Sequence, residues 1–292
     1  MRLVIATYNI QYALGQDGRY DIARIADAVA EADIILFQEV TQNWTRNDGE
    51  DQVAELAARL NRHVVFGSTF DSDASAVVDG KVVNRRRTFG NMIASRWPIL
   101  SSRTQLLPKH ALPETMDVQR CVVEGICQTP AGPIRAYSVH LSHISAGQRL
   151  PQVEVLMRFI REAQTDALPA DGPFPQAWDG DAVEVPLPAS VILGGDFNCT
   201  AESREIELVC GEMDPHRGRL RRADQLVDTF VAAGHDPLAA STFYTQESGY
   251  KIDHLVATPD LAGAVVRSWI GDSKASDHYP VFAELDWAGR TV

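Results

Sequence analysis

The sequence has few cysteines, fewer cations than anions and no long apolar run. Its four cysteines lack metal-ligand spacing, so we expect neither a disulfide scaffold nor a cysteine-held zinc site. No apolar run reaches the roughly 18 residues that a membrane-spanning helix needs, and the first residues show no pattern of a secretory leader. We therefore expect a cytoplasmic protein without a membrane span, whose cysteines (Cys121, Cys127, Cys199 and Cys210) are reduced thiols.

Cations are scarce relative to acids. The chain has 27 lysines and arginines against 39 aspartates and glutamates, which gives a formal net charge of −12. Broad binding to nucleic acid requires many cations to neutralise phosphates, so this balance argues against it. Two arginine-rich stretches, 85–87 and 217–222, leave a local basic patch open, although solvated surface loops are the commoner explanation. Nucleic acid therefore stays open as a partner but is not favoured.

What the sequence does have is a series of apolar runs of strand length. They read RLVIATYNI, DIILFQEV, HVVFGSTF, NMIASRW, RCVVEGICQ, IRAYSVHL, VILGGDF, IDHLVAT and YPVFAEL. Several are apolar at successive positions, which is typical of strands covered on both faces. Apolar residues repeat with the helical period over 22–29, 53–60 and 153–160. The pattern predicts a layered α/β protein in which sheets pack face to face beneath helices, as one domain over residues 1–292.

One segment fits neither periodicity. From Leu168 to Pro188 the composition shifts to proline, glycine, aspartate and alanine, which predicts a surface insertion within the domain. Because loops choose the substrate in such folds, this insertion and the segment 70–87 are the expected selectivity elements.

Polar and ionisable residues recur where the predicted strands end or begin. They are Asn9, Glu39, His140, Asp196 and Asn198, and towards the C-terminus Asp253, Asp277 and His278. Taken singly, each has a turn-forming or packing explanation. In layered α/β folds, however, ligands gather where strand ends open into loops, so the recurrence predicts a single site.

The composition of this set favours one kind of chemistry. Oxygen donors without a Cys/His cluster suit a hard cation, Mg²⁺ with Mn²⁺ as a substitute, better than Zn²⁺. Mg²⁺ leaves positions for water and a substrate phosphate, so a phosphate ester is the natural substrate. Glu39 and Asn9 could hold the cation, and Asp196 could take the proton of the attacking water. His278, held by Asp253, could donate to the phosphoryl group.

Five motifs in order carry a family resemblance. TYNIQ, QEV, GGDFN, KIDHL and SDHYP, spread from Thr7 to Pro280, resemble those of the endonuclease/exonuclease/phosphatase (DNase I-like) superfamily of metal-dependent phosphohydrolases. The resemblance implies a four-layered α/β sandwich, two packed mixed sheets flanked by helices, with the active site in a cleft at one end of the sheets.

The resemblance also implies a role for each residue. Glu39 and Asn9 fall on metal-binding positions, Asn9 contacting metal or phosphate, and Asp277 on a second metal contact. Asp196 would orient or deprotonate the nucleophilic water, and Asn198 would steady the transition state.

The remaining positions concern the phosphate and the leaving group. His278 would act with Asp253 as its partner, and His140 would touch the phosphate or the leaving oxygen. Arg120 matches a position that often contacts phosphate in relatives, and a plain salt bridge at an edge strand is an equal alternative.

Together these features predict a Mg²⁺-dependent phosphoric ester hydrolase, acting as a phosphodiesterase or phosphatase on a small-molecule or lipid-type substrate. The alternative is a DNase I-like endonuclease or exonuclease, and a non-catalytic scaffold is the least favoured of the three. The substrate, the number of metal ions and the oligomeric state stay open.

Overall fold

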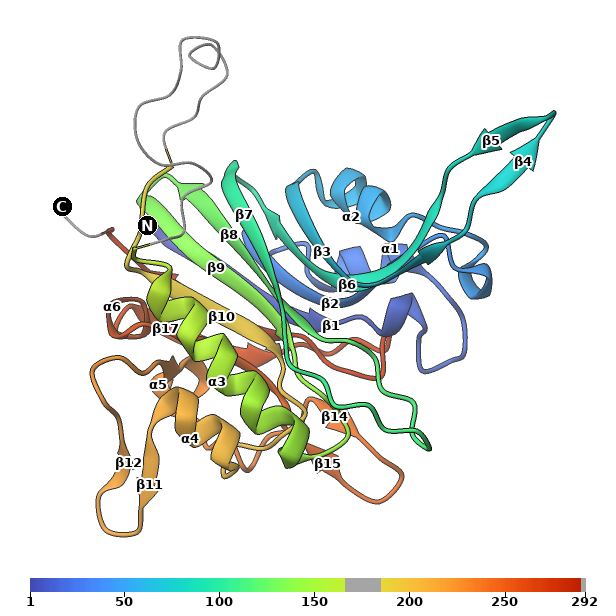
Figure 1. Ribbon diagram of the computed structural model, residues 1–292. Helices are drawn as coiled ribbons and strands as arrows, with labels where there is room; N and C mark the ends of the chain where they lie inside the picture. The colour runs from blue at the N-terminus through green and yellow to red at the C-terminus, as the bar shows by residue number, and fades with distance from the viewer. Residues whose placement is uncertain (166–184, 290–292) are drawn as a thin grey trace.

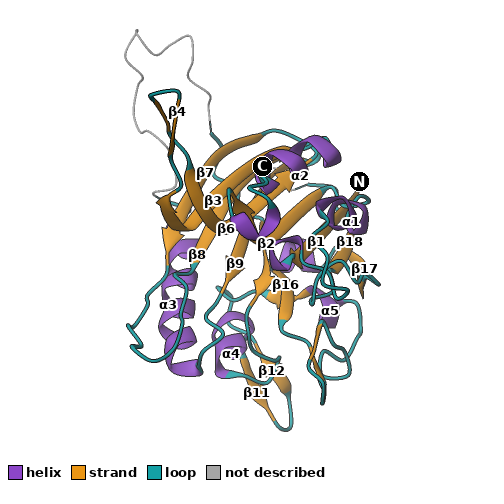
Figure 2. Cartoon of the chain, turned by 90° about the vertical axis from the view of Figure 1, so that its right-hand side faces the viewer, coloured by secondary structure: helices purple, strands orange, loops and turns teal. Residues whose placement is uncertain are grey.

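The computed structural model describes residues 1–165 and 185–289. Within them, two large mixed sheets pack face to face, and helices cover their outer faces (Figures 1 and 2). This confirms the predicted four-layered α/β sandwich. The predicted insertion from Leu168 to Pro188 lies outside the described residues as far as position 184.

The first sheet has six strands among the described residues. Their order is β17 (Val265–Ile270), β18 (Val281–Asp286), β1 (Arg2–Asn9), β2 (Ile34–Gln42), β6 (Arg86–Ser95) and β3 (His63–Asp73). Strands β1 and β2 are parallel, and every other pair in this sheet is antiparallel.

The second described sheet, also six-stranded, repeats this plan. Its order is β13 (Val227–Asp228), β16 (Asp253–Ala257), β10 (Val191–Asp196), β9 (Gly132–His140), β8 (Cys121–Thr129) and β7 (Ile99–Leu106). Here β9 and β10 form the parallel pair, and their neighbours run antiparallel. Three hairpins project from the sheets: β4 (Ala76–Val78) with β5 (Lys81–Val83), β11 (Glu212–Asp214) with β12 (Gly218–Leu220), and β14 (Phe243–Tyr244) with β15 (Gly249–Tyr250).

The helices pack on the outer faces of the sheets or at their margin, where Leu261 and Ala262 join the layer between the sheets. These helices are α1 (Ile22–Ala28), α2 (Gln52–Leu60), α3 (Ala146–Glu162), α4 (Arg204–Cys210), α5 (Thr229–Ala232) and α6 (Pro259–Ala262), with short 3₁₀ turns at Gln11–Ala13 and Thr45–Asn47. The first three coincide with the predicted helical periods. Across the described ranges, none of them combines the length and the apolar character that crossing a membrane requires.

Three apolar layers hold these elements together. The layer between the sheets contains Leu3, Ile5, Leu36, Val123, Ala136 and Ile192, all essentially inaccessible to solvent. A second layer packs the outer face of the first sheet against α1 and α2, and a third packs the second sheet against α3 and α4. The four cysteines are buried and free, as expected of reduced thiols.

The strand directions bring the predicted site residues to one edge. The parallel pairs β1/β2 and β9/β10 carry their polar residues at their carboxyl ends. Asp196, the last residue of β10, lies opposite His140 on β9 and opposite Asp253 at the start of antiparallel β16. Asn9, at the end of β1, donates from Nδ2 to Oδ2 of Asp196 at 3.0 Å and so joins the two sheets at this edge.

Two glycines precede Asp196 because the strand has no room for side chains there. A Cβ atom at Gly194 would lie 2.8 Å from Leu36 and 2.9 Å from Leu255. One at Gly195 would overlap the carbonyl oxygen of Val139 in the paired strand β9. Only glycine lets β10 approach both the opposite sheet and its parallel partner, which fixes the position of Asp196.

Replacing Gly195 with alanine is therefore expected to destabilise the protein. Backbone atoms cannot yield as a side chain can, so we expect a loss of at least the 1–3 kcal/mol (roughly) that is typical of overpacking. The free energy of unfolding from urea denaturation would measure it. Gly147→Ala in α3 is the matched control, since its Cβ would find only the Ser145 hydroxyl at 3.6 Å. Equal stabilities of the two variants would contradict the packing argument.

Candidate active site

The predicted residues meet at a cleft of about 550 Å³ at the edge where the two parallel strand pairs end. Eight of the nine line it: Asn9, Glu39, Arg120, His140, Asp196, Asn198, Asp277 and His278. The ninth, Asp253, is fully buried and contacts His278. The structure thus brings all nine together, although they are spread from position 9 to position 278.

Glu39 owes its position to an irregularity in β2. The pairing of β2 with β6 shifts register between Phe37 and Val40, and Glu39 there has a φ of 61°. Such a bulge re-aims a side chain, and a positive φ is costly for a residue other than glycine. Bulge and strain together direct the Glu39 carboxylate into the cleft.

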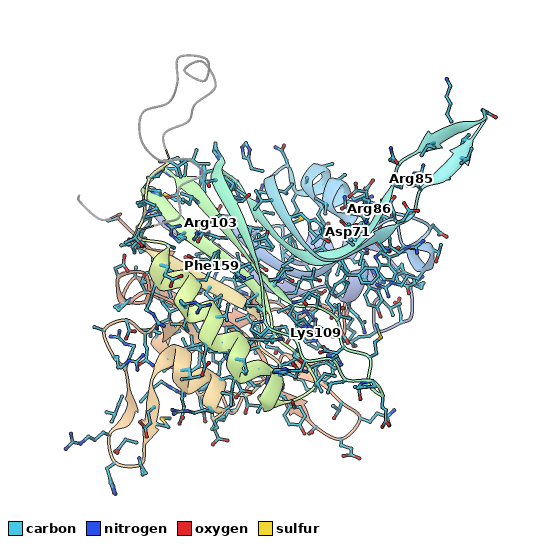
Figure 3. All side chains as sticks on the ribbon, viewed as in Figure 1. Asp71, Arg85, Arg86, Arg103, Lys109 and Phe159 are labelled. Carbon is cyan, nitrogen blue, oxygen red and sulfur yellow. The ribbon has the colours of Figure 1, made fainter. Side chains whose placement is uncertain are left out.

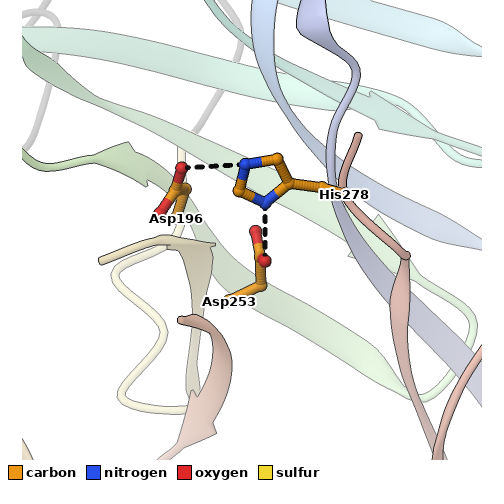
Figure 4. A group of neighbouring side chains, drawn as sticks. All are labelled: Asp196, Asp253 and His278. Carbon is orange, nitrogen blue, oxygen red and sulfur yellow. Dashed lines mark hydrogen bonds and ion pairs between the residues drawn. The ribbon is translucent and has the colours of Figure 1, made fainter. Parts of the chain in front are cut away.

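Asp196, His278 and Asp253 form a chain of contacts (Figure 4). Nδ1 of His278 lies 2.8 Å from Oδ2 of Asp253, and its Nε2 lies 3.6 Å from Oδ2 of Asp196. Both ring nitrogens therefore face carboxylates. The backbone amide of Asn198 donates to Oδ1 of Asp196 at 2.8 Å, which fixes the orientation of that carboxylate.

Burial and neighbouring charges shift the pKa values of Asp196 and His278. Burial raises the pKa of Asp196, with the neighbouring charge of Asp253 adding to the effect and His278 opposing it. Burial alone would lower the pKa of His278, but Asp253 and Asp196 outweigh it and raise that pKa well above the usual range. The two carboxylates thus favour the protonated, imidazolium form of His278.

His140 has the opposite character. Burial, with the positive charge of Arg120 adding to it, lowers its pKa well below the usual value and favours the neutral ring, even though its Nε2 lies 3.3 Å from Oδ2 of Asp196. Nη1 of Arg120 lies 3.0 Å from Nδ1 of His140, and Nη2 lies 3.0 Å from Nδ1 of His143. Nδ2 of Asn198 lies 3.2 Å from Nε2 of His140. A buried guanidinium, an amide and a neutral imidazole thus form one polar group in the cleft.

This arrangement bears on the two explanations of Arg120. Its side chain is buried and lines the cleft, and its guanidinium lies within hydrogen-bond distance of His140 and His143. Its Nε atom is buried without a hydrogen-bond partner among the described residues. Contact with substrate phosphate stays a prediction, and the geometry favours it over a surface salt bridge at an edge strand.

The donor set fits a divalent cation. Burial raises the pKa of Glu39 and of Asp277, and the charge of Asp277 raises that of Glu39 further, so the two carboxylates lie near each other. Among the described residues around the cleft are four carboxylates, of which Asp196 and Asp253 are buried and Glu39 and Asp277 partly exposed, against the cations Arg46, Arg120 and a His278 of raised pKa. Carboxylates in excess of nearby cations are neutralised by protons, which their raised pKa values reflect, or by a bound cation.

One cluster of carboxylates and a histidine has the spacing of a metal site, but its atoms are better explained as hydrogen-bond partners of one another. Ligand atoms of Asp196, Asp253 and His278 lie within 4.8 Å of one another. A ligating histidine needs an unprotonated nitrogen, whereas both nitrogens of His278 face carboxylates and its pKa is raised. Glu39, Asn9 and Asp277 are therefore the better candidates to hold a cation.

Sequence reasoning missed several residues of the cleft. Nε2 of Gln11 donates to Oδ2 of Asp277 at 2.8 Å; Gln11, to which no role was assigned, is the last residue of the motif TYNIQ. His143 follows His140 in the motif VHLSH, where a second histidine three positions on was the available signal. Tyr12 and Trp44, which also line the cleft, lie in a 3₁₀ turn and a loop that carry no periodic pattern.

Comparisons with known proteins show the family and the fold. The model of the Endonuclease/Exonuclease/phosphatase family matches residues 6–278. A protein of that family from Beutenbergia cavernae has a solved structure with a TM-score of 0.67 and 21% sequence identity, covering 99% of this chain and 72% of its own. A family member from Bacteroides vulgatus has a TM-score of 0.65 and 20% sequence identity, and the match covers 98% of this chain and 99% of that protein. The mannosyl-6-phosphatase Bt3783 of Bacteroides thetaiotaomicron has a TM-score of 0.61 and 17% sequence identity, and the match covers 98% of this chain and 100% of that protein. No match was found among curated proteins.

Proposed function

The chain belongs to the endonuclease/exonuclease/phosphatase family, and on that premise we propose that it is a Mg²⁺-dependent hydrolase of a small-molecule or lipid-type phosphate ester. Mn²⁺ would substitute for Mg²⁺. The observation that carries the proposal is the convergence of four carboxylates with Arg120, His140 and His278 in or beside a single cleft built from both sheets. The predicted cytoplasmic location stays a prediction.

Asp196 is the proposed base. A water molecule beside its carboxylate would give up a proton as its oxygen attacks phosphorus, and the raised pKa makes Asp196 a stronger base than an exposed aspartate. Nδ2 of Asn9 and the amide of Asn198 hold its two oxygens in place. The base is thus oriented before substrate arrives.

The charge that develops on the phosphoryl group needs donors. His278 would donate from its Nε2–H, because Asp253 holds the other nitrogen. Asn198, Arg120 and the neutral ring of His140 would contact the remaining phosphate oxygens or the leaving oxygen. Glu39, Asn9 and Asp277 would hold a divalent cation, which supplies neutralisation of the phosphoryl oxygens when it is bound.

Metal removal is the direct test. We expect purified protein to hydrolyse bis-p-nitrophenyl phosphate or p-nitrophenyl phosphate with Mg²⁺ or Mn²⁺, to lose that activity with EDTA, and to regain it when metal is restored. The release of p-nitrophenolate reports the rate. A rate that is unchanged by the chelator would contradict the assignment of Glu39, Asn9 and Asp277.

A nuclease is the second candidate, favoured by the arginine-rich stretches. Arg85 and Arg86 lie at the base of the projecting β4/β5 hairpin (Figure 3), and Arg86 pairs with Asp71 at 2.7 Å. Arg219 donates to the backbone carbonyls of Gly211 and Ala201. Because several of these cations serve internal contacts, we rank nucleic acid below a small substrate. Nicking of supercoiled plasmid with metal present would reverse that order.

A further inference from the structure

One part of the cleft takes no part in the chemistry proposed above. It consists of Tyr12, Trp44, Arg46 and Phe70, called here the aromatic wall. The guanidinium carbon of Arg46 lies 3.7 Å from the ring centroid of Tyr12 and 4.3 Å from that of Trp44. The rings of Trp44 and Phe70 are 5.4 Å apart. The wall therefore combines flat apolar surface with one positive charge.

The aromatic wall is held in place before any ligand binds. Nε1 of Trp44 donates to the carbonyl of Thr88 at 2.7 Å. Tyr12 belongs to three successive residues with positive φ (44°, 45° and 65°), none of them glycine. Its carbonyl oxygen accepts a hydrogen bond from Gln52 at 2.8 Å. Strained backbone of this kind persists where the surroundings fix it, and it clusters at ligand sites.

Arg46 differs from most arginines at the surface of this protein. No carboxylate among the described residues pairs with it, whereas Arg24 and Arg86, for example, each pair with aspartate. Contact with two rings orients a guanidinium plane and leaves its N–H edges available to an anion. The aromatic wall thus offers a positioned fork for a carboxylate or phosphate.

We propose that the aromatic wall binds the part of the substrate beyond the scissile phosphate, and that this part is a flat ring bearing a second anionic group. The ring would pack on Trp44 and Phe70, and the second anion would accept hydrogen bonds from Arg46. A lipid tail could cover the rings but would leave the Arg46 charge unmatched. The inference rests on the proposed function, which places the scissile phosphate beside Asp196 in the same cleft.

Non-hydrolysable phosphonates separate this inference from the hydrolysis itself. Isothermal titration calorimetry with Mg²⁺ present would compare phenylphosphonate, 3- and 4-phosphonobenzoate, and hexylphosphonate. We expect at least one phosphonobenzoate to bind about 10-fold or more tightly than phenylphosphonate, as a charge-assisted hydrogen bond supplies. Phenylphosphonate should in turn bind better than hexylphosphonate.

Variants assign the effect to the wall. Arg46→Gln should remove the advantage of the phosphonobenzoate over phenylphosphonate, so that the two ligands bind the variant with similar affinity. Trp44→Leu should weaken every ring-bearing ligand about 5-fold or more, and Trp44→Phe should retain most of the affinity if folding is intact. Arg59→Gln, on the exposed side of α2 where Arg59 pairs with Glu55, is the matched control and should change nothing.

Several results would overturn the inference. One is equal affinity for phenylphosphonate and both phosphonobenzoates, and another is an Arg46→Gln variant that still prefers a phosphonobenzoate. A third is a hexylphosphonate that binds more tightly than the ring-bearing ligands. The last is a protein that binds no phosphonate at all, whether or not it binds DNA oligonucleotides. Because binding requires no turnover, a failed hydrolysis assay leaves this test intact. Conversely, an active hydrolase that is indifferent to ring and anion would keep the proposed function and reject the aromatic wall as a substrate site.

Discussion

Replacing Asp196 with asparagine is expected to lower kcat for phosphate ester hydrolysis by about 100- to 10,000-fold, the range that loss of a positioned general base costs. The carboxylate is buried, its pKa is raised by that burial, and two donors fix its oxygens. An asparagine amide keeps the shape but cannot accept the proton of the water. KM should change far less than kcat, because the missing step is proton transfer and not substrate binding.

Two controls make this result interpretable. Circular dichroism and the melting temperature should show that the variant is folded. Asp272→Asn removes an exposed carboxylate outside the cleft and should keep the wild-type rate. A folded Asp196→Asn enzyme with wild-type kcat under saturating metal would remove Asp196 from the mechanism, and with it the role that the sequence predicts for the GGDFN motif.

The site could be predicted because the fold converts strand ends into neighbours. Apolar runs identified nine strands, and each polar residue beside a run was assigned to the same edge without any knowledge of distances. The parallel pairs β1/β2 and β9/β10 explain why this works. Parallel strands end at the same edge, and antiparallel β16 and β18 begin there, so Asp253 and His278 join residues from the first half of the chain.

What the sequence did not reveal has physical reasons. Strands β7 and β17 went unrecognised because they lie at sheet edges, where one side of the pairing is open and polar residues interrupt the apolar pattern. The bulge at Glu39 depends on pairing with β6, which no local pattern encodes. The aromatic wall combines two 3₁₀ turns, the loop residue Trp44 and the end of β3, which long-range contacts such as that of Trp44 with Thr88 bring together.

These omissions concern selectivity more than chemistry. The residues proposed to act on phosphorus lie at the ends of regular strands, where periodicity locates them. Arg46 lies in a 3₁₀ turn that carries no such signal, whereas Phe70 ends the predicted run HVVFGSTF and opens the segment 70–87 expected to govern selectivity, without a pattern that shows it faces the cleft. The sequence alone therefore predicted the class of reaction, whereas an inference about the shape and charge of the substrate required the structure of the cleft.

Replacing Asp253 with asparagine is expected to lower kcat by about 100-fold or more and to change its pH dependence. Oδ2 of Asp253 bonds to Nδ1 of His278, and its Oδ1 is buried without a hydrogen-bond partner among the described residues. The charge of Asp253 is therefore balanced chiefly by His278. Without it, burial and the remaining carboxylates alone set the pKa of His278, which falls.

The sign of the pH effect follows from the role of the imidazolium. If protonated His278 donates to the phosphoryl group, kcat declines as pH rises through its pKa, so Asp253→Asn should move the alkaline limb of the kcat profile to lower pH. His278→Gln, which has no ionisable group, should lose that limb. Profiles of kcat from about pH 6 to about pH 11, which span the raised pKa of about 10 of His278, would measure both. An alkaline limb that stays in place in Asp253→Asn, or moves to higher pH, would show that His278 does not act as a cation held by Asp253.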